Sequence, residues 1–178
     1  TNVRILGCHI ECADDCICLK ASKGNIDFTK LDSMVKNLCE DSDTALAGFG
    51  IMMDGGLVKE YYASPFSKEY RHVSYSVCKT VVALAVGVAC DKKLLSVDTK
   101  LSSIFPEHNK IFMKKNMKQI TIKHLLTMTA GVNFDEISAF FSYDWRKDYM
   151  GSNVMFPPGS AFYYNSLNSY MLSACIGK

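Results

Sequence analysis

An uninterrupted apolar run from Val81 to Cys90 is the feature that most limits how this chain can fold. A helix that is apolar on every side is typically buried in a core rather than laid on a surface. The run is shorter than the roughly 20 apolar residues that a bilayer span requires. We therefore expect a central helix, buried on all faces, inside a globular domain and no membrane span.

A serine and a lysine three positions apart, Ser76 and Lys79, stand just before this run. Residues at i and i+3 share one face of a helix, so the two side chains are expected to lie beside each other. The positive end of the helix dipole favours the negative charge that develops on an attacking serine oxygen and on the carbonyl it attacks. The pattern indicates nucleophilic acyl transfer. The alternative is a serine that caps a solvated helix start.

The composition is that of an ordinary globular domain. Of 178 residues, 48% are hydrophobic and 21% charged, and the formal net charge is +2. This balance does not favour nucleic acid as a partner, and we expect the basic cluster at residues 114–118 to be a solvated loop or helix end. The sequence leaves the compartment open. The lack of a signal-peptide pattern in this chain favours the cytoplasm.

The chain has eight cysteines, four of them within residues 8–18. We expect Cys78, Cys90 and Cys175 to be reduced thiols in apolar surroundings, where cysteine behaves as a small hydrophobe. A zinc site in the N-terminal group would use Cys8, His9, Cys12, Cys16 and Cys18. The paired C-x2-C knuckles of such sites are missing, and the histidines form no H-E-x-x-H pair. The sequence implies no metal and no other cofactor.

Residues 1–23 differ from the rest of the chain. Three short alternating runs, broken near Gly7 and at Ala13, predict small strands. With Asp14 and Asp15 they resemble one coil of the polygalacturonase-like glycoside hydrolases, a resemblance that would make these aspartates catalytic acids. Because a solenoid needs about three or more coils to be stable, one coil predicts no glycosidase. We expect either a β-helix-like remnant or an irregular arm that packs on the main domain.

After a turn-rich break, the pattern predicts helices around one hairpin. We expect a helix from Asp27 to about Glu40, then two strands at residues 47–53 and 57–62 about a tight turn. Further elements are a short helix over residues 121–128 with Gly131 as its C-terminal cap, a turn at residues 156–159 and a buried helix from Asn168 to Ile176.

From about residue 26 onward, the chain resembles the serine β-lactamase-related family, which includes class C β-lactamases, low-molecular-weight penicillin-binding enzymes and esterases. Five ordered segments carry the resemblance: Met53–Val58, Ser74–Thr80, Leu94–Asp98, Ile120–Gly131 and Pro158–Ser166. The resemblance implies an α+β fold (an α/β sandwich) of the β-lactamase/transpeptidase type for residues 24–178.

The resemblance also implies roles for individual residues. Ser76 would be the acylated nucleophile, Lys79 its base or proton relay, and Tyr164 the shuttle for a proton to and from the leaving group. Because the ordinary pKa of lysine and of tyrosine lies near 10, the site must change these values for either group to act as a base near neutral pH. Ser166 occupies a substrate-binding position that is commonly Asn in class C enzymes. Its hydroxyl lacks the paired donor and acceptor of an amide, which disfavours efficient β-lactam turnover.

The implied activity is that of a serine hydrolase with an acyl-serine intermediate, acting on a small-molecule or peptide-like ester, amide or β-lactam carbonyl. The family's late strand, with a Lys-Thr-Gly or His-x-Gly motif and the second oxyanion-hole amide, has no counterpart before Lys178. We therefore expect little hydrolysis by residues 1–178 alone. Two alternatives are a non-catalytic β-lactam or peptidoglycan binder, and a fragment of a carbohydrate-active protein. Substrate choice and oligomeric state stay open.

Overall fold

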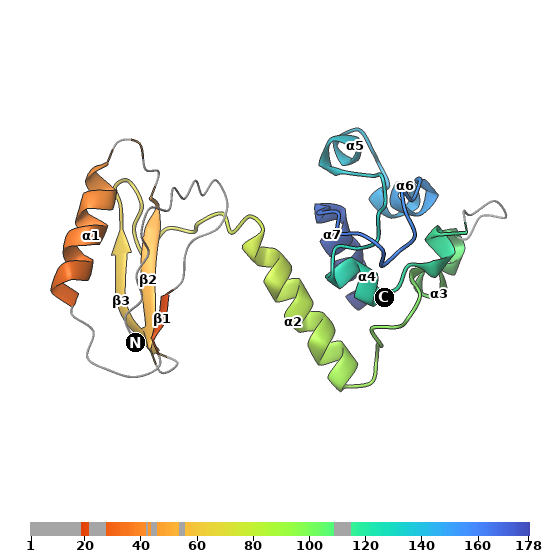
Figure 1. Ribbon diagram of the computed structural model, residues 1–178, viewed down its shortest axis with the longest axis horizontal. Coiled ribbons are helices and arrows are strands. Elements are labelled where there is room, and N and C mark those ends of the chain that lie inside the picture. Colours follow the sequence, from red (N-terminus) through yellow and green to blue (C-terminus); the bar gives the residue numbers. More distant parts are fainter. Residues whose placement is uncertain (1–18, 22–27, 42, 44–45, 54–55, 109–114) are drawn as a thin grey trace. The chain divides into compact units, whose positions relative to one another are not determined.

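The computed structural model describes residues 19–21, 28–41, 43, 46–53, 56–108 and 115–178. The chain forms two compact units, residues 1–75 and residues 76–178. The first unit contains a sheet and one helix, and the second is built from helices (Figure 1). This mixed content belongs to the α+β class, as expected from the sequence.

In the first unit, helix α1 lies beside a small sheet (Figure 1). The elements are β1 (Leu19–Ala21), α1 (Phe28–Glu40), β2 (Gly48–Met53) and β3 (Gly56–Tyr62). Strands β2 and β3 are antiparallel, with Gly48 opposite Tyr62 and Met53 opposite Gly56, and β1 pairs in parallel with β2. The predicted helix and hairpin are confirmed, with bounds that differ by a single residue.

Buried apolar side chains and hydrogen bonds to Asp32 join helix α1 and the hairpin. Val35 of α1 and Ile51 of β2 are buried. Asp32 of α1 accepts hydrogen bonds from Lys59 and Tyr61, which lie two positions apart in β3 and therefore on the same face of the strand. The other predicted strands of residues 1–18, with the zinc-type ligands and Asp14 and Asp15, lie outside the described residues.

The second unit begins with a long helix and continues through short ones. They are α2 (Val77–Asp91), α3 (Leu101–Ile104), α4 (Ile122–Leu126), α5 (Glu136–Phe140), α6 (Trp145–Gly151) and α7 (Ser166–Ile176), with single 3₁₀ turns at Pro106–His108 and Met117–Gln119. The predicted buried C-terminal helix is confirmed, and it begins two residues earlier than expected. Helices α5 and α6 were not predicted from the sequence.

The core of the second unit gathers around α7 and the segments that precede α4. Its fully buried large apolar and aromatic side chains are Val86, Leu101, Phe105, Met117, Ile120, Ile122, Leu125, Val132, Tyr149 and Met171. Each such apolar side chain stabilises the fold by about 1.5–3 kcal/mol when removed from water. The one hydroxyl in this set is satisfied, because Tyr149 donates a 2.7 Å hydrogen bond to Asn168 Oδ1.

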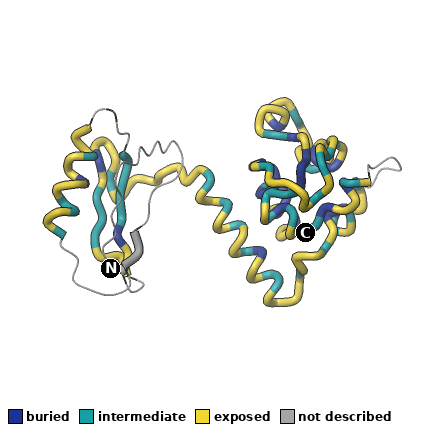
Figure 2. The backbone as a smooth tube through the Cα atoms, viewed as in Figure 1, coloured by how far each residue is buried: buried dark blue, intermediate teal, exposed yellow. Residues whose placement is uncertain are grey.

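Helix α2 is not buried on all faces, so that prediction was wrong. Most of α2 is coloured as exposed or intermediate in Figure 2. Only Val86 is buried on this helix, while Val81 and Leu84 are 64% and 66% exposed. The physical reason is that α2 packs chiefly against one neighbour in its unit, α7, which covers one side of it. The same geometry leaves Cys78 exposed, contrary to expectation, whereas Cys90 is half-buried and Cys175 is buried.

Gly131 has a different role from the predicted helix cap. Helix α4 ends at Leu126, and Thr127 is its C-cap. Gly131 lies beyond it with φ +66°, and a Cβ atom there would stand 2.7 Å from the ring of Phe156. The glycine is required because the backbone takes a left-handed conformation in contact with an aromatic ring.

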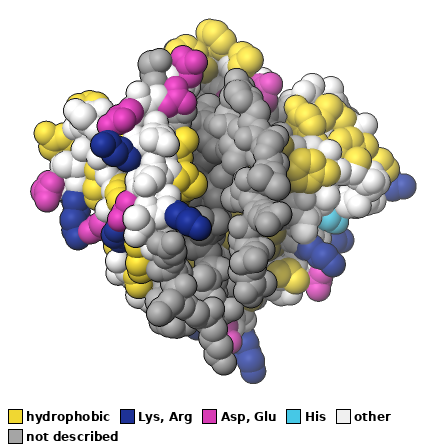
Figure 3. All heavy atoms as spheres, turned by 60° about the vertical axis from the view of Figure 1, so that its left-hand side comes forward, with side chains coloured by type: hydrophobic (Ala, Val, Ile, Leu, Met, Phe, Trp, Pro, Cys, Tyr) yellow, Lys and Arg dark blue, Asp and Glu magenta, His cyan; other side chains and the backbone are white. Residues whose placement is uncertain are grey.

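Lys115 and Lys118 of the basic cluster are exposed, as expected, although Met117 between them is buried. On the face drawn in Figure 3, basic and acidic side chains are interspersed among exposed hydrophobic ones. None of the helices in the described part of the chain is long and apolar enough to cross a bilayer.

Candidate active site

Ser76 stands at the N-terminus of α2 but does not cap it. Its backbone has φ −71° and ψ −10°, and its side chain makes no hydrogen bond to the first turn of the helix. The preceding residue, Tyr75, has φ +40°, a region that non-glycine residues rarely occupy. The hydroxyl of Ser76 instead accepts a 2.6 Å hydrogen bond from Nζ of Lys79, one turn along the helix. The simple capping alternative is therefore wrong.

Tyr164 reaches the same serine from the loop before α7. Its hydroxyl oxygen lies 2.7 Å from Ser76 Oγ, and Lys79 Nζ lies 5.1 Å from the centroid of its ring. An ammonium group only donates hydrogen bonds, so the contact with Lys79 leaves the proton of Ser76 available for donation to the oxygen of Tyr164. The structure thus brings together the three residues that the sequence singled out as catalytic.

The surroundings of Tyr164 lower its pKa below the ordinary tyrosine value. The largest cause is the hydrogen bond with Lys79 and the next is the hydrogen bond with Ser76, while partial burial acts in the opposite direction. A hydrogen bond to the phenolate favours the charged form, so the phenolate is reached at a lower pH than in free tyrosine. This is the direction that a proton acceptor for Ser76 requires.

Ser166, the predicted substrate-binding residue, is half-buried at the first position of α7. Its hydroxyl contributes to the lowered pKa of Tyr164. The pKa of Glu136 is also lowered, and the Ser166 side chain is the largest cause. The charge of Lys79 acts on Glu136 in the same direction.

Asn165 connects the segment that carries Tyr164 and Ser166 to the segment before α5. Its side-chain NH₂ donates to the carbonyl oxygens of Val132 and Phe134 at 3.0 and 2.9 Å. Its Oδ1 accepts the N–H of Leu167 at 2.8 Å and so caps α7. The side chain is only 2% exposed. An Asn before an apolar helix is a recognisable N-cap signal, but its contacts with the 132–134 segment depend on the tertiary fold.

His124, at the centre of the predicted short helix, has a structural role at the start of α4. Nδ1 of His124 accepts the backbone N–H of Thr121 at 3.2 Å, at the start of α4. Burial is the main cause that lowers the pKa of His124. In the part of the chain that the structure describes, no three His, Cys, Asp or Glu side chains gather as metal ligands would.

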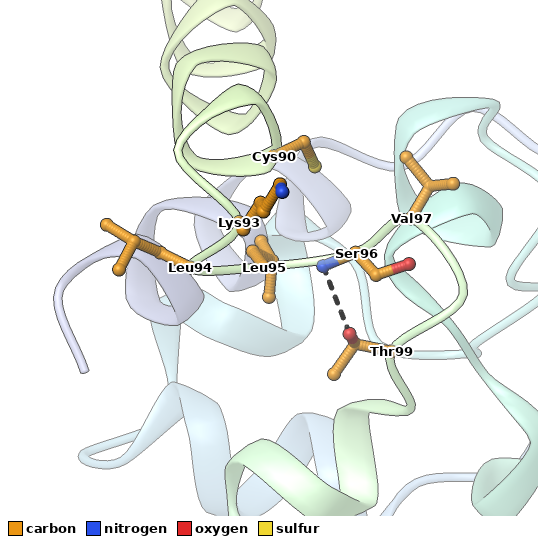
Figure 4. A pocket seen from close by; sticks show the side chains of 7 residues that line it. All are labelled: Cys90, Lys93, Leu94, Leu95, Ser96, Val97 and Thr99. Carbon is orange, nitrogen blue, oxygen red and sulfur yellow. Dashed lines mark hydrogen bonds between the residues drawn. The ribbon is translucent and has the colours of Figure 1, made fainter.

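A separate open pocket lies at the opposite end of α2 (Figure 4). It has a volume of about 550 Å³ and is lined by Cys90, Lys93, Leu94, Leu95, Ser96, Val97 and Thr99. Because a helix rises 1.5 Å per residue, Cys90 lies about 20 Å along α2 from Ser76. This pocket is therefore not part of the Ser76 site.

The protein-family model described as Beta-lactamase matches residues 31–178. This chain belongs to the β-lactamase family. The family resemblance inferred from the five ordered segments is thereby confirmed. Among curated proteins, none matches the chain significantly.

Solved structures show the same fold at low sequence identity. A protein assigned as a β-lactamase from Bacteroides dorei has a TM-score of 0.65 and 19% identity, over 85% of this chain and 46% of that one. A protein assigned as a 6-aminohexanoate-dimer hydrolase from Bacillus anthracis has a TM-score of 0.64 and 18% identity, over 81% and 43%. The octameric penicillin-binding protein homologue from Pyrococcus abyssi has a TM-score of 0.63 and 20% identity, over 86% and 39%.

These structures confirm the expected β-lactamase/transpeptidase-like fold, because all three matches cover most of this chain. The chain spans less than half the length of each of them. The domain boundary expected near residue 23 stays a prediction.

Proposed function

We propose that the chain carries the acyl-serine site of a hydrolase, with Ser76 as nucleophile and Lys79 and Tyr164 as its proton-handling partners. The observation that carries the proposal is that the Lys79 and Tyr164 side chains both contact the hydroxyl oxygen of Ser76. Ser76 Oγ lies 2.6 Å from Lys79 Nζ and 2.7 Å from the hydroxyl of Tyr164. This is the nucleophile-and-base arrangement that covalent catalysis by serine requires.

The proton path follows from these contacts. Ser76 Oγ attacks the carbonyl carbon of the substrate, and its proton moves to the oxygen of Tyr164. Tyr164 then gives the proton to the leaving group as the bond between the carbonyl and that group breaks, which produces acyl-Ser76. In the second half, water loses a proton to Tyr164 and attacks the acyl carbon. The bond from this carbon to Ser76 Oγ then breaks, which releases the acid, and Tyr164 returns the proton to Ser76 Oγ.

Lys79 and the helix supply the electrostatic part of the mechanism. The hydrogen bond and charge of Lys79 favour the phenolate of Tyr164, so the tyrosine can accept a proton at a pH below its ordinary pKa. Ser76 lies at the N-terminus of the 15-residue helix α2, whose dipole favours negative charge on the attacked carbonyl oxygen.

The substrate class proposed is an ester, amide or β-lactam carbonyl. Family membership supports a small acyl substrate. The similar solved structures are named as a β-lactamase, a 6-aminohexanoate-dimer hydrolase and a penicillin-binding protein homologue. Ser166 at the position of the class C asparagine favours slow release of a β-lactam acyl group. A binder that keeps a stable acyl-Ser76 is therefore the second candidate function.

The test is intact mass spectrometry after incubation with a penicillin, a p-nitrophenyl ester or a fluorophosphonate. We expect a covalent adduct on the chain that disappears in Ser76→Ala. Ser74→Ala is the matched control, because Ser74 is an exposed serine two residues earlier, and it should keep the adduct. Adduct with product release supports the hydrolase, and a lasting adduct supports the binder. A chain that none of the three reagents labels at Ser76 contradicts both.

A further inference from the structure

We propose that Met128 is a positioning residue of the Ser76 site, which holds the main chain next to Tyr164 through its backbone carbonyl. The proposal rests on the proposed acyl-serine function for its meaning in catalysis. Met128 lies in the segment between α4 and α5. The physical basis is a series of hydrogen bonds that leads from the buried interior of the second unit to the loop before α7.

The first observation is that both neighbours of Tyr164 are tied to the segment after α4. On one side, the backbone N–H of Tyr163 donates a 2.8 Å hydrogen bond to the carbonyl oxygen of Met128. On the other side, the side-chain amide of Asn165 donates to two carbonyl oxygens of residues 132–134. Tyr164 therefore stands between two fixed points of the main chain, and Met128 supplies one of them.

The second observation is the backbone conformation of Met128. Its φ is +54°, in the left-handed region that non-glycine residues rarely occupy. Helix α4 ends at Leu126, and this left-handed residue follows two positions later. A non-glycine residue stays in this region only where the surrounding structure holds it. The direction of the Met128 carbonyl, and with it the bond to Tyr163, therefore depends on the contacts that hold Met128.

The third observation is a buried amide that anchors the side chain of Met128. Nδ2 of Asn168 lies 3.3 Å from Sδ of Met128 and donates to it, and Oδ1 of the same amide accepts a 2.7 Å hydrogen bond from the hydroxyl of Tyr149. Asn168 is 1% exposed and Tyr149 is fully buried. The reverse orientation of the amide would place Oδ1 against the sulfur, which is itself an acceptor. The amide is therefore fixed at both ends, and it fixes the sulfur of Met128.

The consequence concerns the hydroxyl of Tyr164. The Tyr164 side chain is 51% exposed, so its own packing holds it only in part. Its hydroxyl nevertheless lies 2.7 Å from Ser76 Oγ, and a hydrogen bond weakens steeply as its angle departs from linear. Without the anchor at Met128, the hydroxyl moves away from Ser76 and Lys79 more often. The two hydrogen bonds that lower the pKa of Tyr164 then weaken.

The experiment is a ¹³C NMR titration of the intact chain labelled at Cζ of tyrosine, with the Tyr164 signal assigned by its loss in Tyr164→Phe. Met128→Leu removes the sulfur acceptor and keeps an apolar side chain of similar volume. We expect the midpoint of the Tyr164 titration to rise by about half a unit to one unit, and fluorophosphonate labelling to slow about 10-fold. Met117→Leu is the matched control, because Met117 is fully buried in the same unit and its carbonyl binds Ile120. Neither quantity should change in this control.

A rescue variant and a double-mutant cycle test the route. Met128→Gln restores a hydrogen-bond acceptor on an unbranched side chain and is expected to recover the wild-type midpoint. If Met128 acts through Tyr164, Met128→Leu no longer slows labelling in the Tyr164→Phe background.

An unchanged Tyr164 midpoint in Met128→Leu overturns the proposal, and so does an equal slowing of labelling in both backgrounds. A Met128→Gln variant that behaves like Met128→Leu overturns the role of the sulfur as the anchor. Near-ultraviolet circular dichroism checks that each variant keeps the fold. The titration needs no turnover, so its outcome is independent of whether Ser76 is acylated.

Discussion

The side-chain amide of Asn165 donates a 2.9 Å hydrogen bond to the carbonyl oxygen of Phe134, 31 positions earlier in the chain. This bond joins the loop that carries Tyr164 to the segment that leads into α5. Both partners are buried, and neither carries out chemistry itself. The contact ties the loop that carries Tyr164 and Ser166 to the segment that leads into α5.

Replacing Asn165 by Ala is expected to destabilise the second unit. The change leaves two buried carbonyl oxygens without their donor and removes the cap of α7, and together these losses cost about 2–4 kcal/mol. Urea denaturation followed by circular dichroism measures the effect. Asn133→Ala is the control, because Asn133 is exposed and its truncation should change stability by less than about 0.5 kcal/mol. Equal stability of the two variants contradicts the structural role of Asn165.

Replacing Tyr164 by Phe is expected to slow acylation of Ser76 by about 10²–10⁴-fold, since the group that accepts the serine proton is lost. The rate of fluorophosphonate labelling, read by intact mass, measures this. Tyr163→Phe is the matched control, because it removes the neighbouring hydroxyl and should change the rate little. If both variants label at the wild-type rate, Tyr164 is not the proton acceptor.

Lys79 is expected to be the main determinant of the pKa of Tyr164. The hydrogen bond with Lys79 is the largest cause of the lowered pKa of Tyr164, so Lys79→Met is expected to move that pKa upward, toward the ordinary value near 10. In the wild type, phenolate appears at lower pH than in the unfolded chain, so Tyr164 contributes stability above the unfolded pKa, and this is lost as the pH falls through the folded pKa. The tyrosine ¹³C titration measures the shift. A Tyr164 midpoint that stays in place or falls in Lys79→Met would disprove the coupling.

Gly131 and Gly87 should respond in opposite ways to the same substitution. Gly131→Ala places a Cβ 2.7 Å from the Phe156 ring at φ +66° and is expected to cost about 1–3 kcal/mol. Gly87 lies inside α2, where a Cβ would meet nothing within 4 Å, so Gly87→Ala is expected to stabilise the helix by up to about 1 kcal/mol. Thermal unfolding of both variants tests the pair. A destabilised Gly87→Ala, or a neutral Gly131→Ala, would count against the described packing.

Much of the fold could be predicted because the relevant signals are local. The apolar spacing of residues 28–38 and the Asp54-Gly55-Gly56 turn gave the first helix and the hairpin within a residue. The ordered motifs gave the family and the three residues that meet at Ser76. The short helices α5 and α6 were missed, since their few apolar positions do not form a periodic pattern long enough to detect.

The sequence by itself determined the chemistry that this chain can offer: a serine and a lysine one helical turn apart, and a tyrosine within a recognisable motif. Only the tertiary structure decided that Tyr164 faces Ser76 and that Asn165 holds the loop in place. It also decided that one side of α2 stays exposed. The physical reason is that helical periodicity specifies neighbours three or four positions apart, whereas contacts between residues 31 or 88 positions apart depend on how the elements pack.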